Sequence, residues 1–379
     1  MNTPVTRTPP AAALPKTIKT WRMERPWFKD KDGGRVTEGS IARADLPMPE
    51  PAPGEIVIEI AGCGVCHTDL GFYFEGVPTV NKPPLTLGHE ISGAVVAGEP
   101  AWVGREVIVP AVLPCRSCWI CKTGRGNRCL AQKMPGSSLG VYGGFSSHIV
   151  VPALDVCPVP KDRRIELAKL AVVADAVATP YQAAMRADLR PGDNVVVVGA
   201  AGGVGLYMTQ LAKALGASCV VAVDVDGERL RRSLQYGADA ALDAKGKSAD
   251  DVRKEYGALL KSRGLPNYGW KIFEVSGTKG GQETSLALLG FVGTLVIVGF
   301  NLAKVEYGIS RLMAFDAQII GTWGCLPERY PAVLGLVLGG AVQVEPFVEL
   351  RPMSSIVETF NEAHRIGSPQ KRIVLTPDF

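Results

Sequence analysis

Two patterns of hydrophobic and polar positions divide the chain. Between about residues 35 and 150, short apolar runs such as 55–60 and 105–109 are separated by Pro/Gly turns, which is typical of a small β-barrel. From near Thr179, helical stretches alternate with apolar runs that show no polar face. Such runs between helices predict strands buried on both sides, and therefore a parallel, doubly wound sheet. These runs are residues 194–198, 219–223, 272–275 and 295–298.

The composition of this α/β chain restricts its domain number, its partners and its compartment. A chain of 379 residues, 46% hydrophobic and 21% charged, suggests two domains that each bury a core. A formal charge of +4 is too small to indicate a nucleic-acid partner. Nine cysteines without a recognisable secretory signal favour a reducing cytoplasm. The first 18 residues, rich in Thr, Pro and Ala, are predicted to form a disordered tail, and the apolar stretches 286–300 and 331–342 are too interrupted or too short to span a membrane.

Four cysteines within the loop 114–130 form the most specific motif. Cys115, Cys118, Cys121 and Cys129 follow the spacing C-x2-C-x2-C-x7-C. Four thiolates so close together can converge on a tetrahedral zinc, and a closed four-cysteine site is structural rather than catalytic. Two disulfides are the alternative, but the chain lacks the small size of a disulfide scaffold.

A glycine-rich turn follows the predicted strand 194–198 and precedes a helix at 206–215. Its glycines allow a pyrophosphate to approach the backbone, next to the free N–H groups of the helix N-terminus. Asp224 ends the next strand, where a carboxylate would accept hydrogen bonds from a ribose diol and repel a 2′-phosphate, so NAD is favoured over NADP. The alternative for Asp224 is a solvated turn residue. The turn residues concerned are Gly199, Gly202, Gly203, Val204 and Gly205.

A second group of potential metal ligands has a different character. The run 63–69 (CGVCHTD) is followed by Gly88-His89-Glu90. A thiolate, an imidazole and carboxylates on separate segments can form a catalytic zinc site with an open coordination position. Taken alone, Cys63 and Cys66 could equally be small core residues.

Together, CGVCHTD, GHE, the four-cysteine loop and GAAGGVG resemble the zinc-dependent alcohol dehydrogenases of the medium-chain dehydrogenase/reductase superfamily, from about Lys19 to Leu375. The resemblance implies a GroES-like β-barrel catalytic domain (19–178 and 326–379) and a Rossmann NAD-binding domain (179–325). It also implies one catalytic and one structural zinc per subunit, NAD as cofactor, and a homodimer or homotetramer. The strand 295–298, placed near the sheet edge, would be available for pairing across a two-fold axis.

The resemblance also implies roles for individual residues. Cys66 and His89 would ligate the catalytic zinc, and Thr68 would take the proton of the substrate alcohol. The carboxylates that would orient the ligands are Asp69 and Glu90. Contacts with the cofactor would come from His67 and Arg372 at the phosphates and from Thr179, Val298 and Phe300 at the nicotinamide.

Two positions depart from the family pattern. The third zinc ligand is usually Cys or Glu, and here Asp175 occupies that position. Alternatively, Asp175 caps the following helix while Glu90 or water completes the site. A relay histidine is replaced by Gly71, so the proton would leave through Thr68 and the cofactor ribose, with Tyr73 as a weaker candidate. The remaining histidines, His148 and His364, are expected to be structural.

The substrate expectation rests on resemblance alone. Residues 71–90 and 173–183 are similar to family members that oxidise a cyclic allylic alcohol, 6-hydroxycyclohex-1-ene-1-carbonyl-CoA, in anaerobic benzoyl-CoA degradation. The sequence shows no CoA motif, and solvated surface charge explains Arg22, Arg25 and Lys82 better than contact with CoA phosphates. The alternatives are a general NAD-dependent alcohol or polyol dehydrogenase, an acyl-CoA ene-reductase side activity, and a zinc-ribbon binding module.

Overall fold

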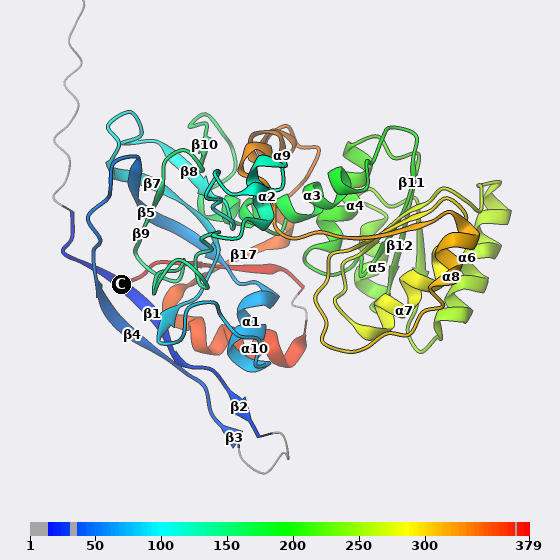
Figure 1. Ribbon diagram of the computed structural model, residues 1–379, viewed down its shortest axis with the longest axis horizontal. Helices are drawn as coiled ribbons and strands as arrows, with labels where there is room; N and C mark the ends of the chain where they lie inside the picture. The colour runs from blue at the N-terminus through cyan, green and yellow to red at the C-terminus, as the bar shows by residue number, and fades with distance from the viewer. Residues whose placement is uncertain (1–13, 31–35, 368–369) are drawn as a thin grey trace, which may run out of the picture.

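The computed structural model describes residues 14–30, 36–367 and 370–379, and they form two lobes that lie side by side (Figure 1). One lobe contains strands from both ends of the chain, and the other contains a parallel sheet with helices on its faces. Most of the predicted tail falls outside the described residues. Strand β1 (Thr17–Arg25) nevertheless begins within its predicted limits, and Ile18 is buried, so ordered structure starts earlier than expected.

The first lobe is built around a seven-stranded sheet of order β10-β8-β7-β5-β18-β17, with β9 also paired to β5. Strand β18, near the C-terminus, pairs antiparallel with β5 through Val374–Gly64 and Leu375–Cys63. Both chain ends therefore build this lobe, as the GroES-like class predicted. Its strands are β5 (Glu55–Gly64), β7 (Glu90–Gly98), β8 (Glu106–Val109), β9 (His148–Pro152), β10 (Cys157–Val159), β17 (Val348–Pro352) and β18 (Arg372–Thr376).

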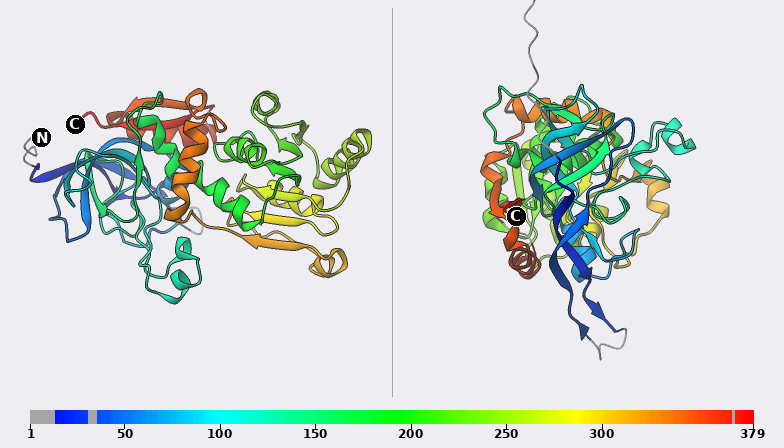
Figure 2. Two further views of the ribbon diagram at one scale, coloured as in Figure 1. Left: turned by 90° about the horizontal axis from the view of Figure 1, so that it is seen from above. Right: turned by 90° about the vertical axis from the view of Figure 1, so that its left-hand side faces the viewer.

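A long hairpin precedes this sheet and projects from the body of the protein (Figures 1 and 2). It was not predicted, because the β-like pattern was placed only from about residue 35 onward. Strand β1 pairs antiparallel with β4 over most of its length and with β6 at Met23. The remaining strands of this region are β2 (Phe28–Lys29), β3 (Val36–Thr37), β4 (Ser40–Pro47) and β6 (Leu85–Thr86).

The second lobe is a six-stranded parallel sheet of order β13-β12-β11-β14-β15-β16, which confirms the doubly wound Rossmann class. Val195, Val196 and Val197 of β11 are fully buried, as the unbroken apolar run predicted. Strand β15 lies near the sheet edge, as predicted, but β16 pairs with its outer side and is the edge strand, so β15 itself is not open to pairing with a second subunit. Strand β16 was not predicted from the sequence, because it begins at Gln318, is only half-buried and contains no long apolar run. The strands are β11 (Asn194–Val198), β12 (Cys219–Asp224), β13 (Ala240–Asp243), β14 (Lys271–Glu274), β15 (Thr294–Ile297) and β16 (Gln318–Gly321).

The helices begin and end at recognisable local signals. Helix α6 starts at a capping box formed by Ser248 and Asp251 and ends at Gly264, which has a left-handed φ of 62°. Among the described residues, no helix is long and apolar enough to cross a membrane. The helices are α1 (His67–Phe74), α2 (Trp119–Lys122), α3 (Ala178–Arg186), α4 (Gly205–Ala214), α5 (Gly227–Ser233), α6 (Ala249–Arg263), α7 (Lys279–Leu288), α8 (Ser310–Phe315), α9 (Tyr330–Leu338) and α10 (Ile356–Ile366).

The two lobes are joined by a shared apolar core. The 3-10 segment η2 (Ala168–Ala174) is buried apart from Lys169 and packs with Tyr207 of the second lobe and Val374 of the first. It leads directly to Asp175 and then to α3, which lies beside α9 between the lobes (Figure 1). This packing holds residue 175 at the junction of the two lobes.

Candidate active site and metal centres

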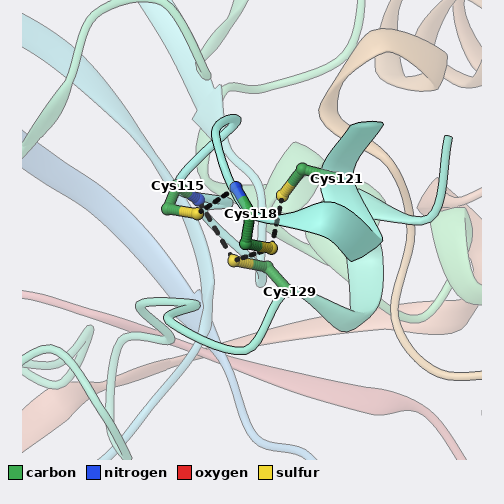
Figure 3. A group of neighbouring side chains, drawn as sticks. All are labelled: Cys115, Cys118, Cys121 and Cys129. Carbon is green, nitrogen blue, oxygen red and sulfur yellow. Dashed lines mark hydrogen bonds between the residues drawn. The ribbon is translucent and has the colours of Figure 1, made fainter. Parts of the chain in front are cut away.

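The four cysteines of the loop 114–130 come together as a compact group (Figure 3). Short helix α2 and the turn before Cys129 bring the sulfurs of Cys118, Cys121 and Cys129 close together. Cys118 Sγ lies 3.5 Å from Cys121 Sγ and 3.8 Å from Cys129 Sγ. Four bonds of about 2.3 Å to one tetrahedral zinc would separate the sulfurs by about 3.8 Å, so the donor set fits this metal.

The chemistry of these thiols also suits a metal. Hydrogen bonds from Ser117 and Cys118 lower the pKa of Cys115 to about 6, which favours its thiolate. All nine cysteines are free thiols, which contradicts the disulfide alternative. No fifth donor belongs to this group among the described residues, so we expect the metal here to be closed off from substrate.

A second group brings together Cys66, His89 and Asp175 from three distant segments, with Glu90 as a fourth possible donor. Cys66 lies just before α1, His89 just before β7, and Asp175 follows η2. Asp175 Oδ2 is 3.6 Å from Cys66 Sγ and 3.6 Å from His89 Nε2. Bonds of about 2.0–2.3 Å to a shared zinc predict donor separations of about 3.3–3.5 Å, so these three residues also fit zinc.

Asp69 connects two of the ligand-bearing segments. Its fully buried carboxylate accepts hydrogen bonds from Cys66 N at 3.0 Å and from Gly88 N at 3.1 Å. Asp69 Oδ1 also faces His89 Nδ1 at 3.4 Å. A carboxylate behind a ligating imidazole fixes the ring so that Nε2 points to the metal, which is the orienting role expected for Asp69.

The carboxylate of Asp175 faces Cys66 and His89. Burial raises the pKa of Asp175, but hydrogen bonding and charge from His89, together with the Thr179 hydroxyl, outweigh burial and bring it to about 2. An ionised carboxylate is the form that binds zinc. The alternative was that Asp175 caps the following helix. Thr179 N does donate to Asp175 O at 2.8 Å, but this oxygen is the main-chain carbonyl, so the bond does not use the Asp175 carboxylate. The two carboxylate oxygens remain with Thr179 Oγ1 on one side and with Cys66 and His89 on the other.

Glu90 lies beside the same group but has another partner. Both of its carboxylate oxygens accept hydrogen bonds from Arg372, with Nε at 3.0 Å from Oε2. Gly64 permits this arrangement, because a Cβ there would lie only 2.0 Å from Glu90 Oε2. We therefore propose Asp175 rather than Glu90 as the third metal ligand, since Glu90 is the partner of Arg372.

A cleft of about 590 Å³ lies between the lobes next to this group. Its lining includes Asp224, His67 and Arg372 together with the predicted turn residues Gly199, Gly202, Gly203 and Val204. Gly205 is the first residue of α4, where a Cβ would lie 1.9 Å from Gly199 O, so this tight turn requires glycine. The carboxylate of Asp224 is held by Ala201 N and Val225 N, each at 2.8 Å. This cradle suits a pyrophosphate and ribose.

Three residues predicted near the nicotinamide are not part of this lining. Thr179 donates its hydroxyl to Asp175, Val298 N donates to Glu274 O, and Phe300 is 65% exposed. Conversely, the lining includes Ser276–Thr278 and the N-terminus of α7, which the sequence reasoning missed. The signal was available, because carboxyl ends of neighbouring parallel strands meet at one edge and this segment follows β14.

Thr68 and Tyr73 were the candidates to replace the relay histidine, and only Thr68 lies at the metal group. Tyr73 packs edge-on against Phe74 and Phe360, and none of the described contacts joins its hydroxyl to Thr68. Thr68 Oγ1 lies 3.6 Å from Cys66 Sγ, at the metal group itself. Cys63 is a buried core residue, as one alternative held. Of the other histidines, His148 contacts the Ser147 hydroxyl and His364 stacks on Phe74 with ring centroids 4.1 Å apart, so both have structural partners.

Comparison with known proteins agrees with this geometry. Residues 52–161 match the alcohol dehydrogenase GroES-like domain, and residues 203–339 match the zinc-binding dehydrogenase family. The chain is 29% identical to sorbitol dehydrogenase of Bombyx mori over 87% of this chain and 93% of that protein. It is 26% identical to an NAD-dependent alcohol dehydrogenase of Sulfurisphaera tokodaii over 88% and 95%. Acetophenone reductase from Geotrichum candidum, solved with NAD, superposes with a TM-score of 0.77 at 26% identity over 96% and 98% of the two chains.

Proposed function

Since this chain belongs to the zinc-dependent alcohol dehydrogenases of the medium-chain dehydrogenase/reductase superfamily, we propose that it oxidises a secondary, cyclic allylic alcohol on a CoA thioester, with NAD as acceptor. The proposed reaction converts 6-hydroxycyclohex-1-ene-1-carbonyl-CoA into the 6-oxo product. Oxidation at a CH–OH group with zinc and a nicotinamide cofactor follows from the family. The CoA thioester and the preference for NAD over NADP are the proposal.

The observation that carries the alcohol chemistry is the meeting of Cys66, His89 and Asp175 beside the cleft. Bound zinc would supply Lewis-acid polarisation of the substrate hydroxyl, and bound NAD would accept the hydride. Thr68 would accept the hydroxyl proton, a role supported by the 3.6 Å between its Oγ1 and Cys66 Sγ. His67 lines the cleft and is largely exposed, so it offers a donor to the cofactor phosphates.

The cyclic thioester substrate is supported by the two segments that carry the resemblance. Residues 71–90 run from α1 through β6 to His89, and residues 173–183 contain Asp175 and the first turns of α3. Although they are far apart in sequence, the two segments meet at His89 and Asp175. Resemblance at this point bears on the substrate more directly than resemblance in the Rossmann sheet.

A polyol dehydrogenase without a CoA requirement is the second candidate. The relative from Bombyx mori is named sorbitol dehydrogenase, and an Aspergillus fumigatus relative that is 28% identical over 83% of this chain is named probable D-xylulose reductase A. Both names describe polyol chemistry. An acidic third ligand, Asp175, fits that candidate as well.

The two candidates separate in a steady-state assay of NADH formation. Purified enzyme would be given the hydroxy thioester, the corresponding free hydroxy acid, cyclohex-2-enol, sorbitol and xylitol under identical conditions. We expect kcat/KM for the thioester to exceed that for every other alcohol by at least about 100-fold. Sorbitol or xylitol turning over as well as the thioester would replace the proposal with the polyol candidate. Incubation of the ketone product with NADH would reveal any ene-reductase side activity.

A further inference from the structure

Four arginines from three separate segments gather near the second lobe's junction with the zinc loop. Arg125 precedes the 3-10 turn η1 (Gly126–Arg128) of that loop and Arg128 ends it, while Arg186 ends α3 and Arg329 ends η3 (Pro327–Arg329). The known chemistry of the site uses none of them. Their arrangement is stabilised by specific contacts rather than by chance proximity on a surface.

The first contact joins α3 to η3. Arg329 Nη1 donates to the side-chain oxygen of Gln182 at 2.9 Å, and Gln182 is buried. Gln182 and Arg186 are four residues apart on α3 and therefore share one helix face. The guanidinium of Arg329 is thus anchored on the face of α3 that also carries Arg186.

The second contact joins the zinc loop to the same place. Asn127 Nδ2 donates to Trp323 O at 2.6 Å, and the guanidinium carbon of Arg128 lies 5.4 Å from the centroid of the Trp323 ring. Trp323 is 40% exposed, so part of its indole ring remains open to solvent. The loop therefore places Arg128 against a partly exposed aromatic ring that lies four residues before η3 in the chain.

The charge of this cluster is unbalanced. Burial together with the positive charges of Arg125 and Arg329 lowers the pKa of Arg186, so Arg186 lies in the field of two like charges. Among the described residues, none of these arginines forms an ion pair. The adjacent carboxylate, Glu328, is already bound to Arg116 at 2.6 Å. Like charges held together without a counter-ion favour a polyanionic ligand.

The cluster also lies within reach of the reaction centre. Thr179, which is bonded to Asp175, and Arg186 are seven residues apart on α3, which corresponds to about 10 Å along the helix. Tyr330 follows Arg329 in the chain, and its hydroxyl donates to Ala174 O, the residue before Asp175, at 2.5 Å. The separation along α3 is the length that an arm of a ligand bound to the arginines would have to span to reach Asp175.

We propose that this cluster, made of Arg125, Arg128, Arg186, Arg329 and Trp323, binds the adenosine 3′-phosphate 5′-diphosphate group of the CoA thioester. The guanidinium groups would contact its phosphates and the exposed part of the Trp323 ring would stack on adenine, while the pantetheine arm would lead to the alcohol. This inference rests on the proposed function, since it assigns the CoA moiety of that substrate to a site.

The test compares two thioesters of the same acyl group, one on CoA and one on N-acetylcysteamine, which lacks all phosphates. The enzyme and the double variant Arg186→Gln/Arg329→Gln would be assayed with both. We expect the ratio of kcat/KM for the CoA ester to that for the short ester to fall at least about tenfold in the double variant. The matched control is Arg253→Gln on α6, whose arginine pairs with Asp250 on the surface, and it should keep the ratio of the unmodified protein. An unchanged ratio in the double variant would overturn the inference while leaving the proposed reaction intact.

A second measurement does not depend on turnover. Calorimetric titration of adenosine 3′,5′-bisphosphate into the full-length protein should show binding that is lost in the double variant and kept in Arg253→Gln. Absence of binding to the unmodified protein would overturn the inference. If no CoA thioester is oxidised, the proposed function fails, and this titration alone then decides whether the cluster binds the nucleotide.

Discussion

Arg372 and Glu90 form a buried, two-pronged ion pair between strands that lie 282 residues apart in sequence. The Glu90 side chain is fully buried and that of Arg372 is only 9% exposed. A Cβ on Gly203 would lie 3.1 Å from Arg372 Nη1, so the same guanidinium also borders the glycine turn of the cleft. One side chain thus links the candidate zinc group in the first lobe to the dinucleotide turn in the second.

Breaking this pair from one side should be costly. In Arg372→Gln, the Glu90 carboxylate stays buried without its partner, and we expect a loss of about 3–5 kcal/mol in the free energy of unfolding. The double variant Glu90→Gln/Arg372→Gln should recover part of this loss. Urea unfolding without cofactor measures both. The control Arg351→Gln breaks the more exposed pair with Glu362 and should cost about 1 kcal/mol or less. Equal losses in Arg372→Gln and the control would contradict this account.

Asp175→Ala tests the third metal ligand. We expect the zinc content to fall from two to one per subunit, because the remaining Cys66 and His89 hold the metal too weakly. Elemental analysis after dialysis measures the content. Glu90→Gln is the matched control and should keep two zinc ions. If Asp175→Ala also keeps two, the assignment of Asp175 is wrong.

Thr68→Ala should lower kcat with little change in zinc content. Removal of the hydroxyl beside Cys66 takes away the first acceptor of the alcohol proton, and we expect a loss of about 10²–10⁴-fold. Thr68→Ser keeps a hydroxyl and should retain most of the activity. Similar rates in the Ala and Ser variants would show that the proton leaves by another route.

Asp224→Asn tests the choice of cofactor. The carboxylate accepts backbone N–H groups through both oxygens and lines the cleft, so its charge is available to the ribose diol. A lost charge-assisted hydrogen bond of about 1.5–3 kcal/mol should raise the KM for NAD by about 10- to 100-fold. The KM for NADP should fall or stay constant, because repulsion of the 2′-phosphate is removed. Steady-state kinetics with each cofactor measure both KM values. An equal rise in the KM for NAD and for NADP would contradict the assignment of Asp224 to the ribose diol.

Glu274 predicts a pH dependence of stability. This fully buried carboxyl belongs to the last residue of β14, and burial raises its pKa although Oε1 accepts hydrogen bonds from Ser276 N and Gly277 N. Since its folded pKa lies above the unfolded value of about 4.3, the folded state prefers the protonated form, and its contribution to stability is lost as pH rises through the folded pKa. Glu274→Gln keeps an accepting oxygen without this penalty. The Tm difference between Glu274→Gln and the unmodified protein should therefore increase from about pH 5 to about pH 8. A constant difference would show that Glu274 is not the titrating group.

Features that depend on neighbouring residues could be predicted from the sequence. The four cysteines lie within fifteen residues, so their convergence follows from local chain geometry. The glycine turn between β11 and α4 is also local in part, because a Cβ on Gly205 would lie 1.9 Å from Gly199 O within the same turn. Unbroken valine runs indicate burial on both faces, and this alone predicts the parallel sheet.

Features formed by distant segments could only be suggested or were missed. Asp175 faces Cys66 across 109 residues, and Arg372 faces Glu90 across 282. Strand β16 was missed because its position at the sheet edge leaves it half-exposed and without an apolar pattern. The arginine cluster joins residues 125, 186 and 329, which no local motif relates.

The sequence by itself therefore determined the chemistry that the chain can hold: a cysteine cage, a dinucleotide turn, and a thiolate and an imidazole for a second metal. The tertiary structure decided between the alternatives left open for Asp175, whose carboxylate faces Cys66 and His89, while Glu90 engages Arg372. The physical reason is that spacing along the chain limits contacts only over a few residues. Over hundreds of residues, the burial of η2 between the two lobes decides which side chains meet.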